Sequence, residues 1–534
     1  MGVIQSRIRD VYLSIQTLVV ALSEMNADFN ALLARIDTKP GLPVSDPTSS
    51  FWLTSPPFPE LTKMQSEKLP SSSAVVIIGS GITGASIAFT LLEECKAMGI
   101  EKSVLMLEAR DITSGATGRN GGHIKVAPYE LFSQMKSKLG VEQAKKIVGF
   151  QMMHLKVLPS LAREKGWGKA EAREVETVDL FLDDAALLKA KAELAELHTY
   201  MPELGKGFQV WDAQEAQKRF SAGTQIKGAL SYTAGALWPF RFVTSCLSYL
   251  LASYPSLVTV ETRTPVTDIT VSSSSNNAYP YVLHTPRGKV SAACVIHATE
   301  AHASTLISGL RGKLFGVRGT MSAQRPGLDF PRTHGERSWS FIHAKGFDYI
   351  TQRPAALTSD EEGSEVMTGG GLMLGGRGMD EIGVLQDNDI RTDIGAYLGG
   401  ILPMVFGAAN WGEDAPGGRM KGLWTGTMGF SADGFPFVGR LHESLTSRKI
   451  TKGEKEDVDI RGEWISAGYG GEGMPQAWLC GVACALMVLG REGVSLEGKA
   501  GRPGGKLADW FPEEMLVSKA RVARANVNEL AGEL

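Results

Sequence analysis

Three glycines at a fixed spacing are the first residues in this 534-residue chain that indicate chemistry. The segment Gly79-x-Gly81-x-x-Gly84 directly follows five apolar residues, as expected for a turn between a buried parallel strand and a helix. Gly79 permits the tight turn, Gly81 lets the backbone approach a pyrophosphate, and Gly84 allows the helix to pack closely on the strand. The helix N-terminus then presents N–H groups to the phosphates. The pattern therefore predicts a dinucleotide site.

The residues around this turn predict the elements that must position it. Residues 74–78 form the strand, the helix runs to about Lys96, and residues 104–107 form a second strand. This second strand ends at Glu108, where an acidic side chain accepts hydrogen bonds from a ribose diol. Strand, helix, strand and terminal acid in this order favour a bound dinucleotide over a glycine-rich turn without a ligand. They do not distinguish a nicotinamide from a flavin.

The segment after Glu108 resembles a known family. Residues 114–122 read SGATGRNGG, which is similar to a segment of the D-amino-acid oxidase (DAO) superfamily of FAD-dependent amine oxidoreductases. In that family the segment runs along the FAD pyrophosphate and ribityl chain toward the flavin ring. The resemblance implies that FAD is contacted by Ala109, Ser114, Thr117, Arg119, Asn120, Gly121 and Gly122. An ion pair that only pins the loop is the alternative role for Arg119.

Later segments resemble the superfamily in the same chain order. Residues 293–300 resemble its strand ending in ATN, with glutamate in place of the asparagine, and residues 424–439 resemble its G…T.DG.P.IG segment. Residues 464–474 resemble its GxGxGM turn, which opens a helix whose N–H groups favour the negative charge of reduced flavin. The resemblance implies further FAD contacts from Val266, Ala298, Thr299, Asp433, Gly471, Gly473 and Met474.

Alternating strands near residues 315–320, 347–353 and 367–376 are of the kind that covers a flavin ring, so we expect the substrate there. The polar candidates for substrate contact are Arg318, Tyr349, Gln352 and Arg353. In the family a hydride leaves the C–H bond beside an amine nitrogen for flavin N5. We therefore expect oxidation of a C–N bond in a small amine or amino acid, with reoxidation by O2. The alternatives are a flavin dehydrogenase with another acceptor, and a tethered flavoprotein with mainly a binding role.

Two positions bear on the cofactor and its reoxidation. Some relatives attach flavin covalently through a histidine or a cysteine, and this chain has Arg119 and Gly426 at the corresponding positions. The resemblance thus implies non-covalent FAD. In the sarcosine-oxidase branch a lysine helps the flavin react with oxygen, whereas Met373 stands at the similar position here. This missing cation weakens the expectation of an oxidase.

The expected fold is α/β, with a Rossmann-type FAD-binding domain interleaved with an antiparallel-sheet α+β substrate domain. We expect FAD-binding parts at 74–170, 235–312 and 421–500, and substrate-domain parts at 171–234 and 313–420. A long N-terminal amphipathic helix (1–36), a linker rich in proline and serine (37–73) and a C-terminal tail (501–534) complete the chain. Residues 380–400 are expected to form a helix on the outside of the second sheet.

Apolar side chains recur in steps of four and three from Ile4 to Ile36, which predicts the amphipathic N-terminal helix. Its longest apolar run is too short to span a membrane. The helix could dock on its own domain or form a dimer with the helix of a second chain. Because the first six residues fit the N-myristoylation pattern, peripheral contact with a membrane is a third alternative.

Composition excludes some partners. The net charge of −3 gives no basic surface for nucleic acid. The five cysteines are widely scattered, with no metal-ligand spacing, so we expect no metal. This cysteine usage suits a reducing compartment, and we expect a cytoplasmic protein, either free or associated with a membrane through its N-terminus. The expected partners are a small amine or amino acid, and O2 or another electron acceptor.

Overall fold

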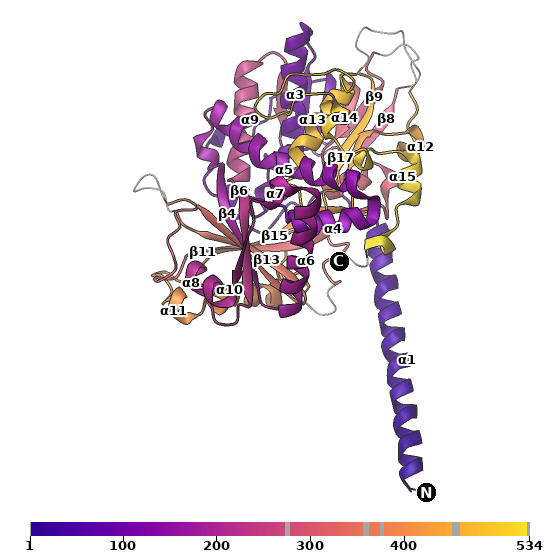
Figure 1. The fold of residues 1–534 in the computed structure, drawn as a ribbon. Helices are drawn as coiled ribbons and strands as arrows, with labels where there is room; N and C mark the ends of the chain where they lie inside the picture. The colour runs from indigo at the N-terminus through magenta and orange to yellow at the C-terminus, as the bar shows by residue number, and fades with distance from the viewer. Residues whose placement is uncertain (1, 273–277, 356–362, 374–378, 451–459, 531–534) are drawn as a thin grey trace.

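The computed structural model describes residues 2–272, 278–355, 363–373, 379–450 and 460–530, and within these ranges it describes side chains from residue 17 to residue 528. Two large sheets organise the described chain (Figure 1). Three helices lie together beside one sheet: α3 (Ile82–Met98), α9 (Pro239–Ser253) and α13 (Ala477–Val488). The strands of the other sheet lie at the opposite end of the body. This is the mixed α/β fold expected from the sequence.

The first sheet carries the glycine turn. In spatial order its strands are β16 (Phe437–Arg440), β17 (Gly462–Ala467), β10 (Gly288–His297), β1 (Ser72–Ile78), β2 (Val104–Leu107) and β7 (Val258–Glu261), with β9 (Tyr281–Thr285) on β10 and β8 (Asp268–Val271) on β9. The five strands from β17 to β7 are parallel. Val75 and Ile77 pack among residues of the helices α3 (Ile82–Met98), α9 (Pro239–Ser253) and α13 (Ala477–Val488), whereas Val76 and Ile78 pack toward β8 and β9. Because both faces of β1 are buried, its apolar run is continuous.

The second sheet is mostly antiparallel. In spatial order its strands are β15 (Met420–Ser431), β11 (Leu314–Gln324), β14 (Val366–Gly369), β13 (Gly346–Gln352), β12 (Arg337–His343), β4 (Arg173–Phe181), β6 (Gly228–Ala236) and β3 (His123–Ile124), with β5 (Gln209–Asp212) on β6. One pair, β12 with β4, is parallel. Since β15 pairs with β11 along its length, the proposed domain boundary at residue 421 falls within a strand of this sheet.

The remaining helices cover the sheets or connect them. They are α2 (Pro59–Thr62), α4 (Pro128–Leu139), α5 (Val141–Glu164), α6 (Asp184–Tyr200), α7 (Pro202–Gly205), α8 (Ala213–Phe220), α10 (Thr392–Phe406), α11 (Ala408–Trp411), α12 (Glu443–Thr446), α14 (Leu507–Trp510) and α15 (Lys519–Arg524). Short 3-10 helices include η1 (Phe51–Leu53), η2 (Ala116–Gly118) and η4 (Glu300–Thr305).

Two expectations about the second sheet were wrong. The helix expected over 380–400 begins only at Thr392, because the backbone before it bonds to β11: Arg318 N donates to Glu381 O at 3.0 Å, and Gly383 N donates to Gly316 O at 2.7 Å. The strand expected over 367–376 ends at Gly369. Its last part, 374–376, lies outside the described residues.

The N-terminal helix α1 (Gly2–Asp37) projects away from the body (Figure 1). Its last turns dock on the body: Leu32 and Ile36 are buried beside Val317, and Arg35 Nε donates to Ile382 O at 3.0 Å. Further out, Met25 is 63% exposed, so the body does not cover that part of the helix. Among the described residues, no helix is both long enough and apolar enough to cross a bilayer.

Candidate active site

A cavity of about 1280 Å³ runs from the glycine turn of the first sheet to the strands of the second sheet. Gly79, Gly81 and Glu108 line one end, and Tyr349 and Lys125 line the other. We refer to the first as the ribose end and to the second as the substrate end. Because one cavity reaches both, a long ligand bound at the glycine turn can reach the second sheet.

The three glycines of the turn have different geometric roles. Gly79 has a φ of +108°, and a Cβ there would lie 2.4 Å from Ala298 O. A Cβ on Gly81 would lie 3.0 Å from Thr117 Oγ1, at the cavity wall. A Cβ on Gly84 would lie 2.1 Å from Gly79 O. Gly84 therefore keeps α3 close to the turn but is not part of the cavity lining.

Glu108 lies at the end of β2 and faces the cavity. Its carboxylate accepts hydrogen bonds from Ser80 N at 3.0 Å, from Ser80 Oγ at 2.7 Å and from Arg110 N at 3.0 Å. A carboxylate has about four acceptor positions, so it can hold these groups and still accept from a ligand hydroxyl. Ala109 and Val266 line the cavity beside it.

Residues 113–122, which we call the flavin loop, pass from the ribose end toward the substrate end. Thr117 Oγ1 accepts from Ile82 N at the start of α3 (3.0 Å), and Asn120 Oδ1 accepts from Gly122 N (2.7 Å). Thr117, Asn120 and Gly121 line the cavity. Ser114 and Gly122 are outside the lining. Within the described part of the chain the buried Ser114 hydroxyl has no hydrogen-bond partner, and Gly122 has a φ of +65° and packs against Leu237.

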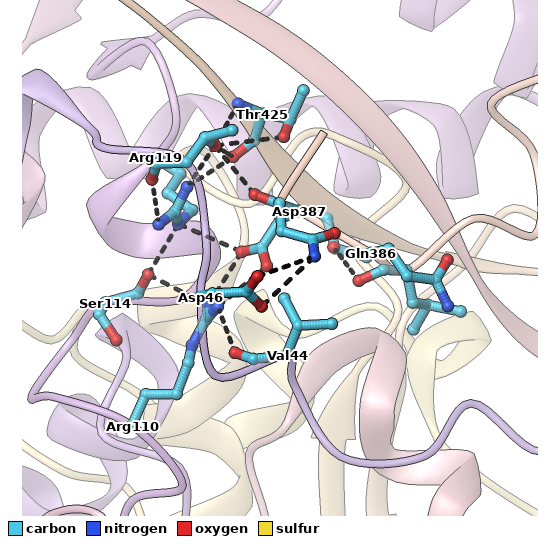
Figure 2. Close-up of polar contacts among 12 residues, drawn as sticks. Val44, Asp46, Arg110, Ser114, Arg119, Gln386, Asp387 and Thr425 are labelled. Carbon is cyan, nitrogen blue, oxygen red and sulfur yellow. Dashed lines mark hydrogen bonds and ion pairs between the residues drawn. The ribbon is translucent and has the colours of Figure 1, made fainter. Parts of the chain in front are cut away.

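Arg119 lines the cavity, but its guanidinium is directed at protein groups (Figure 2). It donates to Ser114 O at 2.9 Å and to Thr425 O at 2.7 Å, and it lies 3.3 Å from the carboxylate of Asp387. Burial lowers the pKa of Arg119 to about 10, and Asp387 opposes this shift. The guanidinium therefore remains charged at neutral pH and pins the flavin loop, which was the alternative role.

Ala298 and Thr299, for which the resemblance implied contacts with FAD, line the cavity. The next residue, Glu300, was not among the candidates because glutamate departs from the family pattern. Its carboxylate accepts from three backbone N–H groups, those of Gly429 (3.1 Å), Gly468 (3.0 Å) and Tyr469 (3.1 Å). Burial raises the pKa of Glu300 to about 7, while these N–H groups act in the opposite direction. Glu300 thus ties β15 and the loop after β17 to the cavity wall.

The turn before α13 also lines the cavity through Gly471, Gly473 and Met474. Asp433, in contrast, is outside the lining. Arg521 of α15 binds its carboxylate with two hydrogen bonds of 2.8 and 2.9 Å. Asp433 therefore joins the C-terminal segment to the turn after β15, which corrects the expectation that it contacts the cofactor.

Among the four substrate candidates, only Tyr349 lines the cavity. Its ring packs against Gly121, where a Cβ would lie 2.3 Å from the ring, and its hydroxyl lies 3.0 Å from the sulfur of Met321. Burial raises the pKa of Tyr349 to about 12, so the hydroxyl is protonated at neutral pH. Tyr349 thus covers the flavin loop from the side of the second sheet.

The other three candidates bind to protein groups, which corrects the expectation that they contact the substrate. Arg318 bonds to Glu381 and lies outside the lining. Arg353 bonds to Glu365 at 2.7 Å and to Glu171 at 2.6 Å. Gln352 accepts a hydrogen bond from the Thr333 hydroxyl at 2.5 Å. All three side chains are buried and bind protein groups away from the cavity.

Sequence reasoning missed an ion pair at the substrate end, between Lys125 and Asp179. Lys125 Nζ also bonds to the Ser340 hydroxyl, and Asp179 accepts from the hydroxyls of Tyr129 (2.9 Å) and Tyr232 (2.8 Å). Asp179 is 1% exposed, yet both members of the pair line the cavity. The available signal was the place of Lys125, three residues after the glycine pair of the flavin loop.

The residues around the cavity fit FAD. Gly79 and Gly81 allow close backbone approach at the start of α3, whose N–H groups suit a pyrophosphate. Thr299 Oγ1 is buried, has no hydrogen-bond partner among the residues that the structure describes, and lies in a residue that lines the cavity, so it can bond to a cofactor hydroxyl or phosphate. Glu108 would hold the ribose, and the flavin loop would follow the ribityl chain toward Tyr349.

Replacing Glu108 by alanine should weaken FAD binding by about 1.5–3 kcal/mol, the usual contribution of hydrogen bonds to a charged group. Titration of the apoprotein with FAD, followed by flavin fluorescence, measures the change. The control is Glu176→Ala, because Glu176 is a partly exposed acid on β4 that pairs with Arg337 outside the cavity. Equal affinities for wild type and Glu108→Ala would show that Glu108 only organises the turn.

Comparisons with known proteins identify the family and the fold of this chain. A family model described as FAD dependent oxidoreductase (DAO) matches residues 74–487. The probable oxidoreductase OrdL of Haemophilus influenzae is 23% identical over 277 residues, which are 50% of this chain and 58% of that protein. The chain thus spans less than two thirds of the length of this curated relative.

Two solved structures share the fold. Glycine oxidase from Geobacillus kaustophilus has a TM-score of 0.57 at 19% identity, over 82% of this chain and 98% of that one. L-proline dehydrogenase from P. horikoshii has a TM-score of 0.56 at 19% identity, over 79% of this chain and 96% of that one. Because the family model covers more than half of the chain, this protein belongs to the DAO family of FAD-dependent oxidoreductases.

Proposed function

We propose that this protein oxidises a C–N bond of a small amino acid or amine, using non-covalently bound FAD. The observation that carries the proposal is the single cavity that joins the glycine turn to a chamber containing the Lys125–Asp179 pair. FAD, when bound, supplies the acceptor for a hydride that leaves the carbon beside the amine nitrogen, and the resulting imine is hydrolysed by water. Neither Arg119 nor Gly426 has a side chain that forms a covalent flavin link, which supports non-covalent binding.

The chain's own residues at the substrate end suit a zwitterion. Lys125 and Asp179 present opposite charges, and an amino acid carries the complementary charges on its carboxylate and ammonium groups. Lys125 has three N–H donors. Within the described residues, two of them form hydrogen bonds, to Asp179 and to Ser340. A substrate carboxylate would take the third donor. Tyr129 and Tyr232 hold Asp179 in place by donating to Oδ2, whereas Lys125 bonds to Oδ1.

The electron acceptor in this proposal is O2, with a different acceptor as the alternative. Met373 lines the cavity, in a turn after β14 and not in the expected strand. The two similar folds include one protein named an oxidase and one named a dehydrogenase, so the fold alone favours neither. Purified protein should therefore be supplied with amino acids and amines in two parallel assays, one for hydrogen peroxide and one with an artificial electron acceptor. Substrate oxidation with the artificial electron acceptor, without formation of hydrogen peroxide, would identify the protein as a dehydrogenase.

Replacing Lys125 by methionine should raise KM for amino-acid substrates by about tenfold or more, because a charge-assisted hydrogen bond contributes about 1.5–3 kcal/mol. The KM for amines that lack a carboxylate should change far less. Steady-state kinetics on matched pairs of amino acid and amine provide the measurement. The control is Lys189→Met, since Lys189 is another lysine of the cavity wall but is 63% exposed. An equal rise in KM for both substrate types would contradict carboxylate recognition.

We also propose that α1 pairs with the α1 helix of a second copy. Near the C-terminal end of α1, the apolar residues Leu32 and Ile36 are buried against the body. The same stripe continues toward the N-terminus, in steps of four and three, through the exposed residues Leu18, Leu22 and Met25. The body buries the C-terminal part of this apolar stripe, and a partner helix can bury the remaining part. This proposal places the protein in the cytoplasm. The competing proposal is that a membrane surface, and not a second helix, covers the exposed part of the stripe.

Removing residues 2–25 should convert a dimer to a monomer and leave the flavin absorbance unchanged, because none of the described residues in this part of the helix lines the cavity. Light scattering after gel filtration measures the mass of both forms. A full-length chain that is monomeric, or one that sediments with lipid vesicles while the deletion does not, would overturn the dimer.

A further inference from the structure

Residues 39–50, which we call the strap, precede the segment 74–487 that matches the family model. Three members of the strap, Gly41, Leu42 and Pro43, line the FAD cavity. The wall of the cofactor site is thus completed by chain from outside the family domain. Three sets of hydrogen bonds hold the strap in this position.

The first set joins the strap to η4. Gly41 O accepts from His302 Nδ1 at 3.1 Å and from Thr305 Oγ1 at 2.8 Å. His302 and Thr305 both line the cavity, immediately beyond Thr299. Gly41 has a φ of +78°, a conformation that suits glycine and turns its carbonyl toward η4. The strap is therefore fastened to one rim of the cavity at Gly41.

The second set lies at the ribose end (Figure 2). Arg110 Nη1 donates to Val44 O at 3.4 Å, and Asn388 Nδ2 donates to the carboxylate of Asp46 at 3.3 Å. Arg110 follows Glu108 by two residues. The strap is thus held to the segment that directly follows Glu108, whose carboxylate would hold the ribose.

The third set is centred on Thr48. Its backbone N and its hydroxyl donate to Asp387 O at 2.8 and 2.9 Å, and the hydroxyl accepts from Thr425 N at 2.9 Å. Thr48 O accepts from Arg119 Nη2 at 2.8 Å. Two residues later, the Ser50 hydroxyl donates to Gly118 O of the flavin loop at 2.7 Å. The strap is consequently tied to the flavin loop, to the segment before α10 through Asp387, and to β15 through Thr425.

The outer surface of the strap faces solvent. Leu42 is 43% exposed, and Ser45 and Asp46 are exposed as well. Hydrogen bonds, and not buried apolar side chains, therefore hold residues 39–48 down. A segment of this kind opens at a lower free energy than the core of a domain.

We propose that the strap is a gate over the ribose end of the FAD cavity, and that FAD enters and leaves when residues 39–48 lift. This inference rests on the FAD site and is independent of the substrate class. A gate limits association and dissociation alike, whereas a residue that only stabilises the bound cofactor limits dissociation.

The test measures both rate constants of FAD binding in Thr48→Val, by stopped-flow flavin fluorescence on apoprotein and on holoprotein. Because the substitution removes the hydroxyl's bonds to Asp387, Thr425 and Arg119 but keeps the side-chain shape, both rate constants should rise by about tenfold. The matched control is Thr199→Val on α6, whose hydroxyl likewise donates to a backbone carbonyl, that of Ala195, at 3.0 Å. Both rate constants should match wild type in this control.

Faster dissociation with unchanged association in Thr48→Val would contradict the gate and leave Thr48 a structural role only. Hydrogen exchange of the wild-type protein gives a second measurement that does not depend on the folding of the variant. The amides of residues 39–48 should exchange more slowly with saturating FAD than in the apoprotein, while those of α6 should not change. Equal exchange of the strap in both forms would overturn the proposal.

Discussion

The site depends on how the carboxylate of Asp387 is neutralised. It is 5% exposed and accepts hydrogen bonds from Arg110 at 2.9 and 3.0 Å, with Arg119 at 3.3 Å. A buried carboxylate is strongly destabilising unless opposite charges and donors satisfy it. Both arginines belong to the segment that follows β2, whereas Asp387 precedes α10 beside the second sheet. The contacts of Asp387 with the two arginines (Figure 2) thus join the segment after β2 to the segment before α10.

Close backbone approach is the second constraint, and it explains why glycine recurs at the contacts. The ring of Tyr349 lies where a Cβ on Gly121 would be, so the second sheet can meet the flavin loop only at a glycine. Glu300 holds a second set of backbone segments close together, since its three backbone partners belong to β15 and to the turn before α13. The Lys125–Asp179 pair lies at the substrate end of the same cavity. Rigid contacts of this kind place a substrate in a constant position relative to a bound cofactor.

The cofactor side of the site could be predicted from sequence because its information is local: strand, glycine turn and Glu108 occupy one short stretch. The substrate side could not, because distant residues decide which charges remain available. Arg318 is neutralised by Glu381, 63 residues away, and Arg353 by Glu171, 182 residues away. The strap shows the same limit: residues 37–73 read as a linker by composition, and only tertiary contacts reveal that part of this linker walls the cavity.

The central claim is that Asp387 holds the FAD site together, and Asp387→Asn tests it most directly. FAD affinity should fall by at least tenfold, because breaking a buried ion pair costs about 3–5 kcal/mol and the flavin loop and strap share this pair. Asp433→Asn is the matched control, since Asp433 also binds an arginine, Arg521, but lies outside the cavity. This control should lower the thermal stability without a change in FAD affinity. An Asp387→Asn variant that unfolds at a lower temperature yet binds FAD as tightly as wild type would contradict the account.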